Sequence, residues 1–503
     1  MNNNLLLLPL LSPFFAAIFC LFFWKQINIQ KAIVMVGVLT MNFGAFYLLA
    51  VVWQQGIQTL EAANWQAPFG IILVADLFSA ILICVAAVVA LMIFIYSFAT
   101  IDVERTHFGF FPILLFLVFG ISGAFLAGDI FNFYVWFEII LVSTFVIITL
   151  GGTKAQLEGA VKYVVINYLA SALFLAGIGI VYGLTGSLNM ADIAVKIRET
   201  TQPGLISLSA IFFIVAFGIK AAVFPLFFWL PPSYHTPPIA ITAFIAGLLT
   251  KVGAYSLIRF FTLIYTHDVD FTHNILLYIA IFTLVIGVGG AIIQTDIRKV
   301  LTFSIISQIG YIILGLGFYT PLALAGAVLF LIHNILVKTN LLLISGVIRR
   351  LGGSYSLKDT GGIYNSHPII AALFLISGFA LTGLPPLSGF WGKLMLIQAG
   401  LQIEEYTLVF ITLAASVASL LYITKIWNEA FWKDHPQGEL KEFSQLRFWK
   451  SNILMLFPIV IISIIILMIG IYPEPFFNMA TEAGQQLFNP EGYIKAVLRP
   501  NKY

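Results

Sequence analysis

Charged side chains are scarce in this chain of 503 residues. Only 9% of the residues are Asp, Glu, Lys or Arg, against about a quarter in soluble proteins, whereas 60% are hydrophobic. This composition indicates an integral membrane protein without a soluble domain. The net charge of +3 is too small and too dispersed for a nucleic-acid-binding surface. We therefore expect no nucleic acid among the partners.

Cysteine is nearly absent, and cofactor motifs are missing. The two cysteines, Cys20 and Cys84, fall in apolar stretches, where inert thiols are expected and disulfides or metal ligands are not. The sequence has no zinc-ligand spacing, nucleotide-binding loop, flavin fingerprint or nucleophile elbow. We expect no metal, no cofactor and no catalytic residue, and any redox chemistry would belong to partner subunits.

Long apolar runs fill the chain instead. A bilayer core of roughly 30 Å needs about 20 apolar residues per helix, and such runs recur from end to end. The first run lacks the positive flank of a cleaved signal peptide, so we expect it to be retained. The sequence thus predicts an all-α polytopic membrane protein with about fourteen spans. They cover residues 4–24, 32–53, 70–98, 108–128, 131–151, 160–186, 205–230, 238–266, 274–294, 300–319, 321–346, 368–400, 406–432 and 452–473.

Two of these spans contain helix-breaking prolines. Span 7 and its exit read FGIKAAVFPLFFWLPPSYHTPP, with Pro225 and Pro231, and span 12 includes LTGLPPLSGFWGK, with Pro385 and Pro386. Proline frees backbone carbonyls at membrane depth, which is tolerated only where protein or water meets the backbone. A lysine lies near each break but in opposite order, as two inverted copies of one unit would place it.

This order predicts two inverted five-helix repeats within a single membrane domain of residues 1–503. The repeats are expected at 108–266 (helices 4–8) and 274–432 (helices 9–13), between three N-terminal helices (1–98) and a last helix with its tail (452–503). Loops after odd-numbered spans hold most of the loop Lys and Arg residues, and positive loops tend to stay in the cytoplasm. Both termini are therefore expected outside.

Several ionisable residues lie deep within the predicted spans: Glu138, Lys220, Lys251, His333, Lys338 and Lys393. A charge at the bilayer centre costs roughly 3 kcal/mol, so it normally faces the bundle interior. Lysines and a histidine on successive helices could pass protons along a path, although Glu138 and Lys220 could equally form a structural ion pair. His333 and Lys338 are about 140° apart on a regular helix, so a π-bulge or a water would have to connect them.

Other ionisable groups are expected to matter less. Asp76 and Asp129 lie near span ends, where a hydrated helix cap is the expected role. Arg259 can extend its side chain to the membrane interface from the end of span 8. His235, in the break after span 7, is either a loop residue or a gate.

The motifs around the buried residues resemble a known family. DIFNFYVWFEI, GIKAAVFPLFFWLPPSYHTPP, LTKVGAY, LIHNILVKTNLLL and LTGLPPLSGFWGK are similar to segments of the antiporter-like subunits shared by respiratory complex I, membrane-bound hydrogenases and Mrp cation/proton antiporters. The C-terminal NPEGYIKAVL resembles the Mrp D subunits more than the complex I relatives. The resemblance implies fourteen helices, with helices 7 and 12 broken, in a bacterial cell (cytoplasmic) membrane.

The resemblance also implies roles and partners. It implies that Glu138 and Lys220 form a modulating ion pair. It also implies that protons are relayed by Lys251, His333 and Lys338, and that Lys393 is the terminal site. The expected partners are other membrane subunits of a hetero-oligomeric antiporter, with H⁺ and Na⁺ as transported ions, and the sodium path could lie in a neighbour. Two alternatives stay open, a proton-pumping subunit of complex I or a hydrogenase, and a structural membrane subunit.

Overall fold

The computed structural model describes residues 6–436, 438 and 445–498, so residues 4–5 of the first predicted span and 499–503 of the tail lie outside the described residues. Among the described residues, eleven helices are long and apolar enough to cross a membrane. Three shorter apolar helices, Leu7–Phe22, Phe110–Leu126 and Pro368–Thr382, complete the set. The prediction of an all-α polytopic membrane protein is therefore confirmed, with eleven candidate spans among the described residues.

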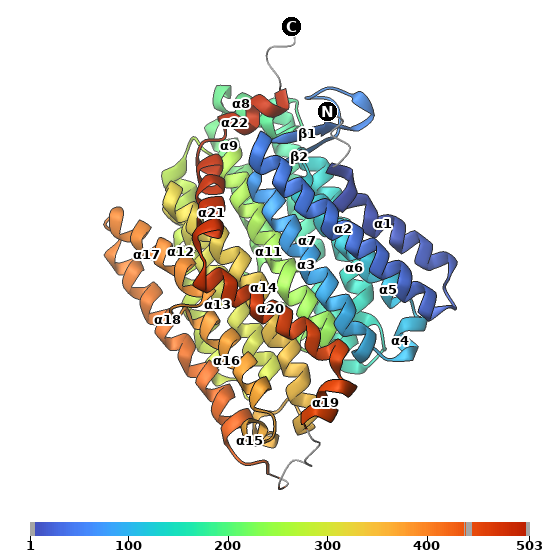
Figure 1. Cartoon of the computed structure of the whole chain (residues 1–503). Coiled ribbons are helices and arrows are strands. Elements are labelled where there is room, and N and C mark those ends of the chain that lie inside the picture. The colour runs from blue at the N-terminus through green and yellow to red at the C-terminus, as the bar shows by residue number, and fades with distance from the viewer. Residues whose placement is uncertain (1–5, 437, 439–444, 499–503) are drawn as a thin grey trace.

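The elements follow one another along the chain (Figure 1). The first half contains α1 (Leu7–Phe22), α2 (Ile27–Gln55), β1 (Gln58–Glu61), β2 (Ile72–Ala75), α3 (Leu77–Thr100), α4 (Val103–His107), α5 (Phe110–Leu126), α6 (Ile130–Thr149), α7 (Lys154–Thr185), α8 (Met190–Glu199), α9 (Pro203–Ala221), α10 (Leu230–Tyr234) and α11 (Ile239–Leu263). The second half contains α12 (Val269–Ile293), α13 (Ile297–Phe318), α14 (Pro321–Gly352), α15 (Ile363–Ser366), α16 (Pro368–Thr382), α17 (Ser388–Gln402), α18 (Tyr406–Ile426), a π-helical turn (Trp427–Trp432), α19 (Gln445–Ser451), α20 (Ile453–Ile471), α21 (Glu474–Phe488) and α22 (Glu491–Leu498). β1 and β2 pair as an antiparallel hairpin.

Capping residues set the ends of the two longest helices. The side chains of Thr153 and Thr320 accept backbone N–H bonds at the start of α7 and α14, which satisfies donors that a helix leaves free. Gly186 and Gly353 end these helices in the left-handed region, with φ of 64° and 76°, where glycine carries no steric penalty. Local sequence therefore fixes both ends of each helix.

Equivalent helix boundaries recur 167 positions apart. Residues 154–185 form α7 and 321–352 form α14, while α6 and α13 begin at 130 and 297, and α11 and α18 at 239 and 406. The backbone of Asp129 pairs with that of Asn189, and Asp296 pairs with Ser356 in the same way. The first pairing precedes α8 and the second precedes α15, and these two helices lie at opposite ends of the bundle (Figure 1). The two halves thus share one helix layout.

The centre of the bundle is formed by α11, α13 and α14. Every residue of α11 is buried, as are nearly all residues of α13 and α14. In Figure 1, α1 and α2 lie at one side of this centre and α18 lies at the other. At Gly253 of α11, an added Cβ would collide with the backbone of Lys220 and Ala221, so the end of α9 is seated directly on the central helix.

Candidate functional site

The first predicted helix break occurs at the end of α9. The helix stops at Ala221, and Ala222 adopts a left-handed φ of 59°. The backbone groups near the break find new partners: the N–H of Phe224 donates to Thr283 Oγ1 of α12 at 2.9 Å, and the indole of Trp229 donates to the carbonyl of Ile219 at 3.0 Å. Lys220 lies on the last turn before this break.

Lys220 points into the protein and not toward lipid. The lysine is 6% exposed, and its Nζ lies 4.7 Å from the centre of the Phe137 ring, at cation–π distance. Beside it is a small cavity with about 20 Å³ of space for water centres, lined also by Tyr163, Asn167 and Tyr234. This space is enough for one water molecule with polar neighbours.

Glu138 lies on α6, next to Phe137. Its side chain is half-buried, and its Oε1 is shielded from solvent without a hydrogen-bond partner among the described residues. Glu138 is close enough to act electrostatically on Lys220, yet no ion pair within 4.0 Å joins the two in the part of the chain that the structure describes. The structure brings the two charges near each other but leaves them separated.

The second predicted break lies between α16 and α17. Gly383 ends α16 with a φ of 87°, and α17 begins at Ser388. The Nζ of Lys393 reaches back across the break and donates to the carbonyl of Thr382 at 2.8 Å and to Ser416 Oγ of α18 at 2.9 Å. It also lies 4.5 Å from the centre of the Tyr311 ring. The lysine therefore satisfies a carbonyl that the break sets free.

Two further lysines are completely buried on the central helices. Lys251 on α11 donates to the carbonyl of Ala246 at 2.8 Å, and Lys338 on α14 donates to Ser304 Oγ of α13. Lys251 and Lys393 both lie near enough to repel the charge of Lys338. Lysines from α11, α14 and α17 therefore share one protein interior.

His333 faces a different neighbour from Lys338. Its Nδ1 lies 2.8 Å from Ser388 Oγ at the start of α17. Its ring packs against Gly389, where an added Cβ would come within 2.8 Å of Nε2. Meanwhile, α14 runs unbroken from Pro321 to Gly352, so the suggested π-bulge between the two residues is absent. The other suggested connection, a bridging water, remains.

The sequence interpretation passed over the uncharged partners of these charges. Ser304, Ser388 and Ser416 each bind one of the ionisable side chains. Asn334 is completely buried, and neither its Oδ1 nor its Nδ2 has a hydrogen-bond partner among the described residues. It precedes Lys338 by one helical turn, so the two share a face. The sequence signal that could have identified Asn334 was its position as a polar residue within an apolar run.

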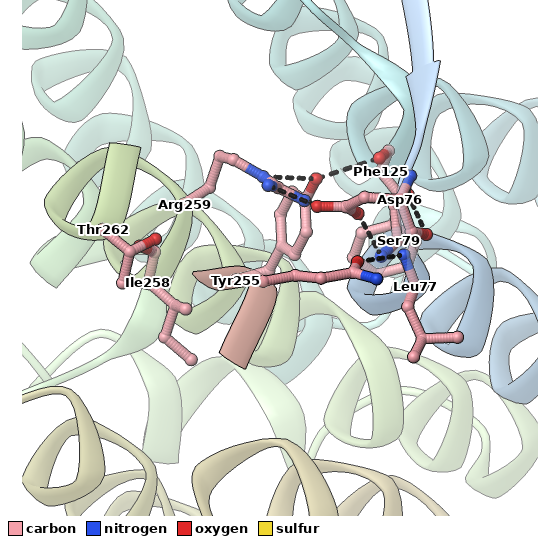
Figure 2. Close-up of polar contacts among 9 residues, drawn as sticks. Asp76, Leu77, Ser79, Phe125, Tyr255, Ile258, Arg259 and Thr262 are labelled. Atoms are coloured by element: carbon pink, nitrogen blue, oxygen red, sulfur yellow. Dashed lines mark hydrogen bonds and ion pairs between the residues drawn. The ribbon is translucent and has the colours of Figure 1, made fainter. Parts of the chain in front are cut away.

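Arg259 points at Asp76 inside the protein, as Figure 2 shows. Its Nη1 lies 2.6 Å from Asp76 Oδ2, both side chains are at most 5% exposed, and Tyr255 Oη accepts from its Nε at 3.3 Å. The snorkelling prediction is therefore wrong. Asp76 does cap α3, through Ser79, but it is 2% exposed and not hydrated as expected.

The side chains of Asp129 and His235 both contact backbone groups. Asp129 caps α6 by accepting from the N–H of Asn132 at 2.6 Å, and it is 6% exposed, so its predicted role as a cap is confirmed and its hydration is not. The Nδ1 of His235 lies 2.6 Å from the carbonyl of Pro231, within the segment that leaves the first break.

Two helix breaks, each with a buried lysine, and a row of lysines on the central helices define a polytopic antiporter-like membrane protein. The chain belongs to the family described as NADH:quinone oxidoreductase/Mrp antiporter, TM, whose model matches residues 127–419. It is 44% identical over 497 residues to the D subunit of the Na(+)/H(+) antiporter of Alkalihalophilus pseudofirmus, covering 99% of this chain and 100% of that protein.

Two other comparisons extend over the whole chain. The D subunit of the Na(+)/H(+) antiporter of Bacillus subtilis is 38% identical over 501 residues, covering 99% of this chain and 100% of that protein. One chain in the structure of the Mrp complex from Dietzia sp. DQ12-45-1b matches with a TM-score of 0.90 at 25% identity, covering 99% of this chain and 100% of that one. The resemblance found in the sequence motifs is thus confirmed.

Proposed function

We propose that this chain is the proton-translocating subunit of a multisubunit monovalent cation (Na⁺)/H⁺ antiporter. The observation that carries the proposal is the set of four lysines, Lys220, Lys251, Lys338 and Lys393, each at most 6% exposed. None of them forms an ion pair within 4.0 Å with a described residue. A buried charge that only stabilised the bundle would be expected to have a counter-charge, as Arg259 has.

The proposed path runs from one helix break to the other. Protons reach the interior beside Lys220, where the small cavity lies, and pass by Lys251 and Lys338 toward Lys393. His333 adjoins this row at the second break, through Ser388. Asn334 offers free polar atoms on the same face as Lys338, so a water held there would connect the histidine to the lysine.

Glu138 is proposed to modulate this path. The Glu138 carboxylate favours the charged form of Lys220 without forming an ion pair with it, and the Phe137 ring lies 4.7 Å from the lysine Nζ. A closer approach would favour the charged lysine, and a larger separation would favour its release of a proton. The movement of this pair would then couple the subunit to its neighbours.

We further propose that residues 108–266 and 274–432 are the two inverted repeats of this transporter. The constant offset of 167 positions between equivalent helix boundaries supports this division. The excess of Lys and Arg in loops after odd-numbered spans supports an outside location for both termini. The proposed location is the bacterial cell membrane, because the two relatives named above are antiporter subunits of bacteria.

The proposal is favoured over a role in a redox-driven pump. Relatives that match this chain over its full length are named as D subunits of Na(+)/H(+) antiporters. Other membrane subunits are its partners, as the match within the Mrp complex indicates. In this view the chain is a transporter subunit and performs no catalysis itself.

Antiport in everted vesicles tests the proposal. Glu138→Ala and Lys220→Ala should each leave the complex assembled but abolish antiport. The matched control is the exposed pair Glu158 and Lys162 on α7, whose side chains lie 2.6 Å apart at the surface. Alanine at either control position should leave antiport unchanged. Normal antiport in Lys220→Ala would exclude the proposed path.

A further inference from the structure

A cavity of about 530 Å³ lies at the end of the bundle that carries α4. Its walls are built by the segment between α3 and α4, by the starts of α7, α11 and α13, and by the end of α14. None of the six proposed proton-transfer residues lines it. Its most notable lining is four arginines: Arg105, Arg298, Arg349 and Arg350.

Two of these arginines share one aromatic ring. The guanidinium carbon of Arg298 lies 3.9 Å from the centre of the Tyr355 ring, and that of Arg349 lies 4.9 Å from it. Arg298 has one carboxylate nearby, Asp296, at 3.5 Å, and its buried Nε has no hydrogen-bond partner among the described residues. Two like charges held this close favour an anion between or beside them.

The remaining arginines leave the cavity positive. Arg105 is compensated, since it forms an ion pair with Asp102 and its Nε donates to the carbonyl of Leu150 at 3.0 Å. Arg349 and Arg350 are exposed, and neither forms an ion pair with a residue that the structure describes. The four guanidinium groups are thus matched by only two carboxylates.

Two long helices also begin at this cavity. Thr153, which caps the 32-residue helix α7, and Ile239, the first residue of α11, are both among its lining residues. A helix N-terminus presents free backbone N–H groups and the positive end of the helix dipole. Their fields add to that of the arginines and favour an anionic ligand, and they offset the negative ends of α3 and α14, which also line the cavity.

We propose that this cavity binds a phosphate group, supplied by an anionic lipid headgroup or by a soluble phosphate. Guanidinium groups hold phosphate oxygens in pairs, and basic pockets between membrane helices suit anionic headgroups. The volume of about 530 Å³ falls within the range of roughly 300–1,000 Å³ that is usual for ligand sites. A phosphate here would tie α7, α11 and α14 together at one end of the bundle.

Binding to the delipidated, purified complex tests this proposal. Native mass spectrometry would follow phosphatidylglycerol and, for comparison, phosphatidylcholine, and a thermal-shift titration would follow inorganic phosphate. Arg349→Gln/Arg350→Gln should weaken phosphatidylglycerol binding about twenty-fivefold, from roughly fivefold for each arginine. Arg349→Lys/Arg350→Lys should restore part of it. The control, Lys25→Gln/Lys358→Gln, removes two lysines that do not line the cavity.

The outcomes separate the possible sources of the phosphate. Selective binding of phosphatidylglycerol, lost only in the arginine-to-glutamine variant, identifies a lipid headgroup. Saturable stabilisation by inorganic phosphate, with the same dependence on the arginines, identifies a soluble ligand. Equal binding by the wild-type complex, the arginine variant and the lysine control would overturn the proposal, because the attraction would then be diffuse surface charge. A complex that binds neither probe would overturn it as well.

Discussion

Replacing Asp76 by Asn leaves the buried guanidinium group of Arg259 without a counter-charge. Arg259 lies 2.6 Å and 2.8 Å from the two carboxylate oxygens, and the two side chains are 5% and 3% exposed. Asn at position 76 still offers an oxygen to the backbone N–H of Ser79, which Asp76 accepts at 2.9 Å. The helix cap is kept, and the loss falls on Arg259, which loses its counter-charge and one hydrogen-bond acceptor, because one carboxylate oxygen becomes an NH2 group. Removing one partner of a buried pair costs roughly 3–5 kcal/mol, because the remaining charge stays desolvated.

Thermal unfolding of the purified complex measures this effect. The control is Asp192→Asn on α8, whose partner Lys196 lies 2.8 Å away but is 40% exposed. Exposed pairs of this kind contribute only about 0.2–1 kcal/mol. Asp76→Asn should therefore lower the unfolding temperature far more than Asp192→Asn does.

A double variant separates the lost pair from the stranded charge. Asp76→Asn/Arg259→Met removes both charges, keeps the cap at Ser79 and should recover much of the stability, because no buried charge is then left without a partner. If the unfolding temperature of Asp76→Asn fell by no more than that of Asp192→Asn, the reasoning would be refuted. A double variant as unstable as Asp76→Asn would refute it as well.

Three further outcomes are expected. Gly287→Ala should destabilise the chain by roughly 1–3 kcal/mol, because an added Cβ would overlap the backbone of Ser307. The control is Gly289→Ala, whose Cβ meets open space, and equal unfolding temperatures of the two variants would contradict the prediction. Ser304→Ala removes the acceptor of the Lys338 ammonium group, so antiport should slow while the complex stays assembled, and an unchanged rate in vesicles would argue against a role for this contact. Ser388→Ala removes the hydroxyl at His333 Nδ1, so the pH profile of antiport should shift and Ser388→Thr should restore it; a profile that does not move would show that the histidine is not tuned from α17.

The helices were predictable because hydropathy is a property of each segment alone. The apolar runs correspond to eleven candidate spans and three shorter apolar helices among the described residues, and the prolines at 225, 385 and 386 marked where two of the runs are interrupted. The hairpin β1–β2 was missed: β1 lies in the connection before the third predicted span, and β2 (Ile72–Ala75) lies inside that span (70–98), where its apolar residues run on into those of α3. Local sequence patterns were therefore enough to predict the helices, but not the hairpin that connects two of them.

Contacts between distant segments were beyond the reach of the sequence. Arg259 was expected to extend to the interface from the end of its span, yet Asp76, which is 183 positions earlier in the chain, lies beside it. Likewise, the helical periodicity correctly separated His333 from Lys338, but it gave no indication that the one faces Ser388 and the other Ser304. Such pairings depend on how helices pack, and packing is decided by the whole chain.

Sodium-driven proton movement in everted vesicles, followed by the quenching of a pH-sensitive dye, tests the central claim most directly. The variant is Lys338→Met, at the completely buried lysine of α14, and the control is Lys196→Met on α8, a partly exposed lysine. With equal amounts of assembled complex, Lys338→Met should reduce the signal to background, and Lys196→Met should keep it. A Lys338→Met complex that moves protons at the control rate would contradict the proposed path.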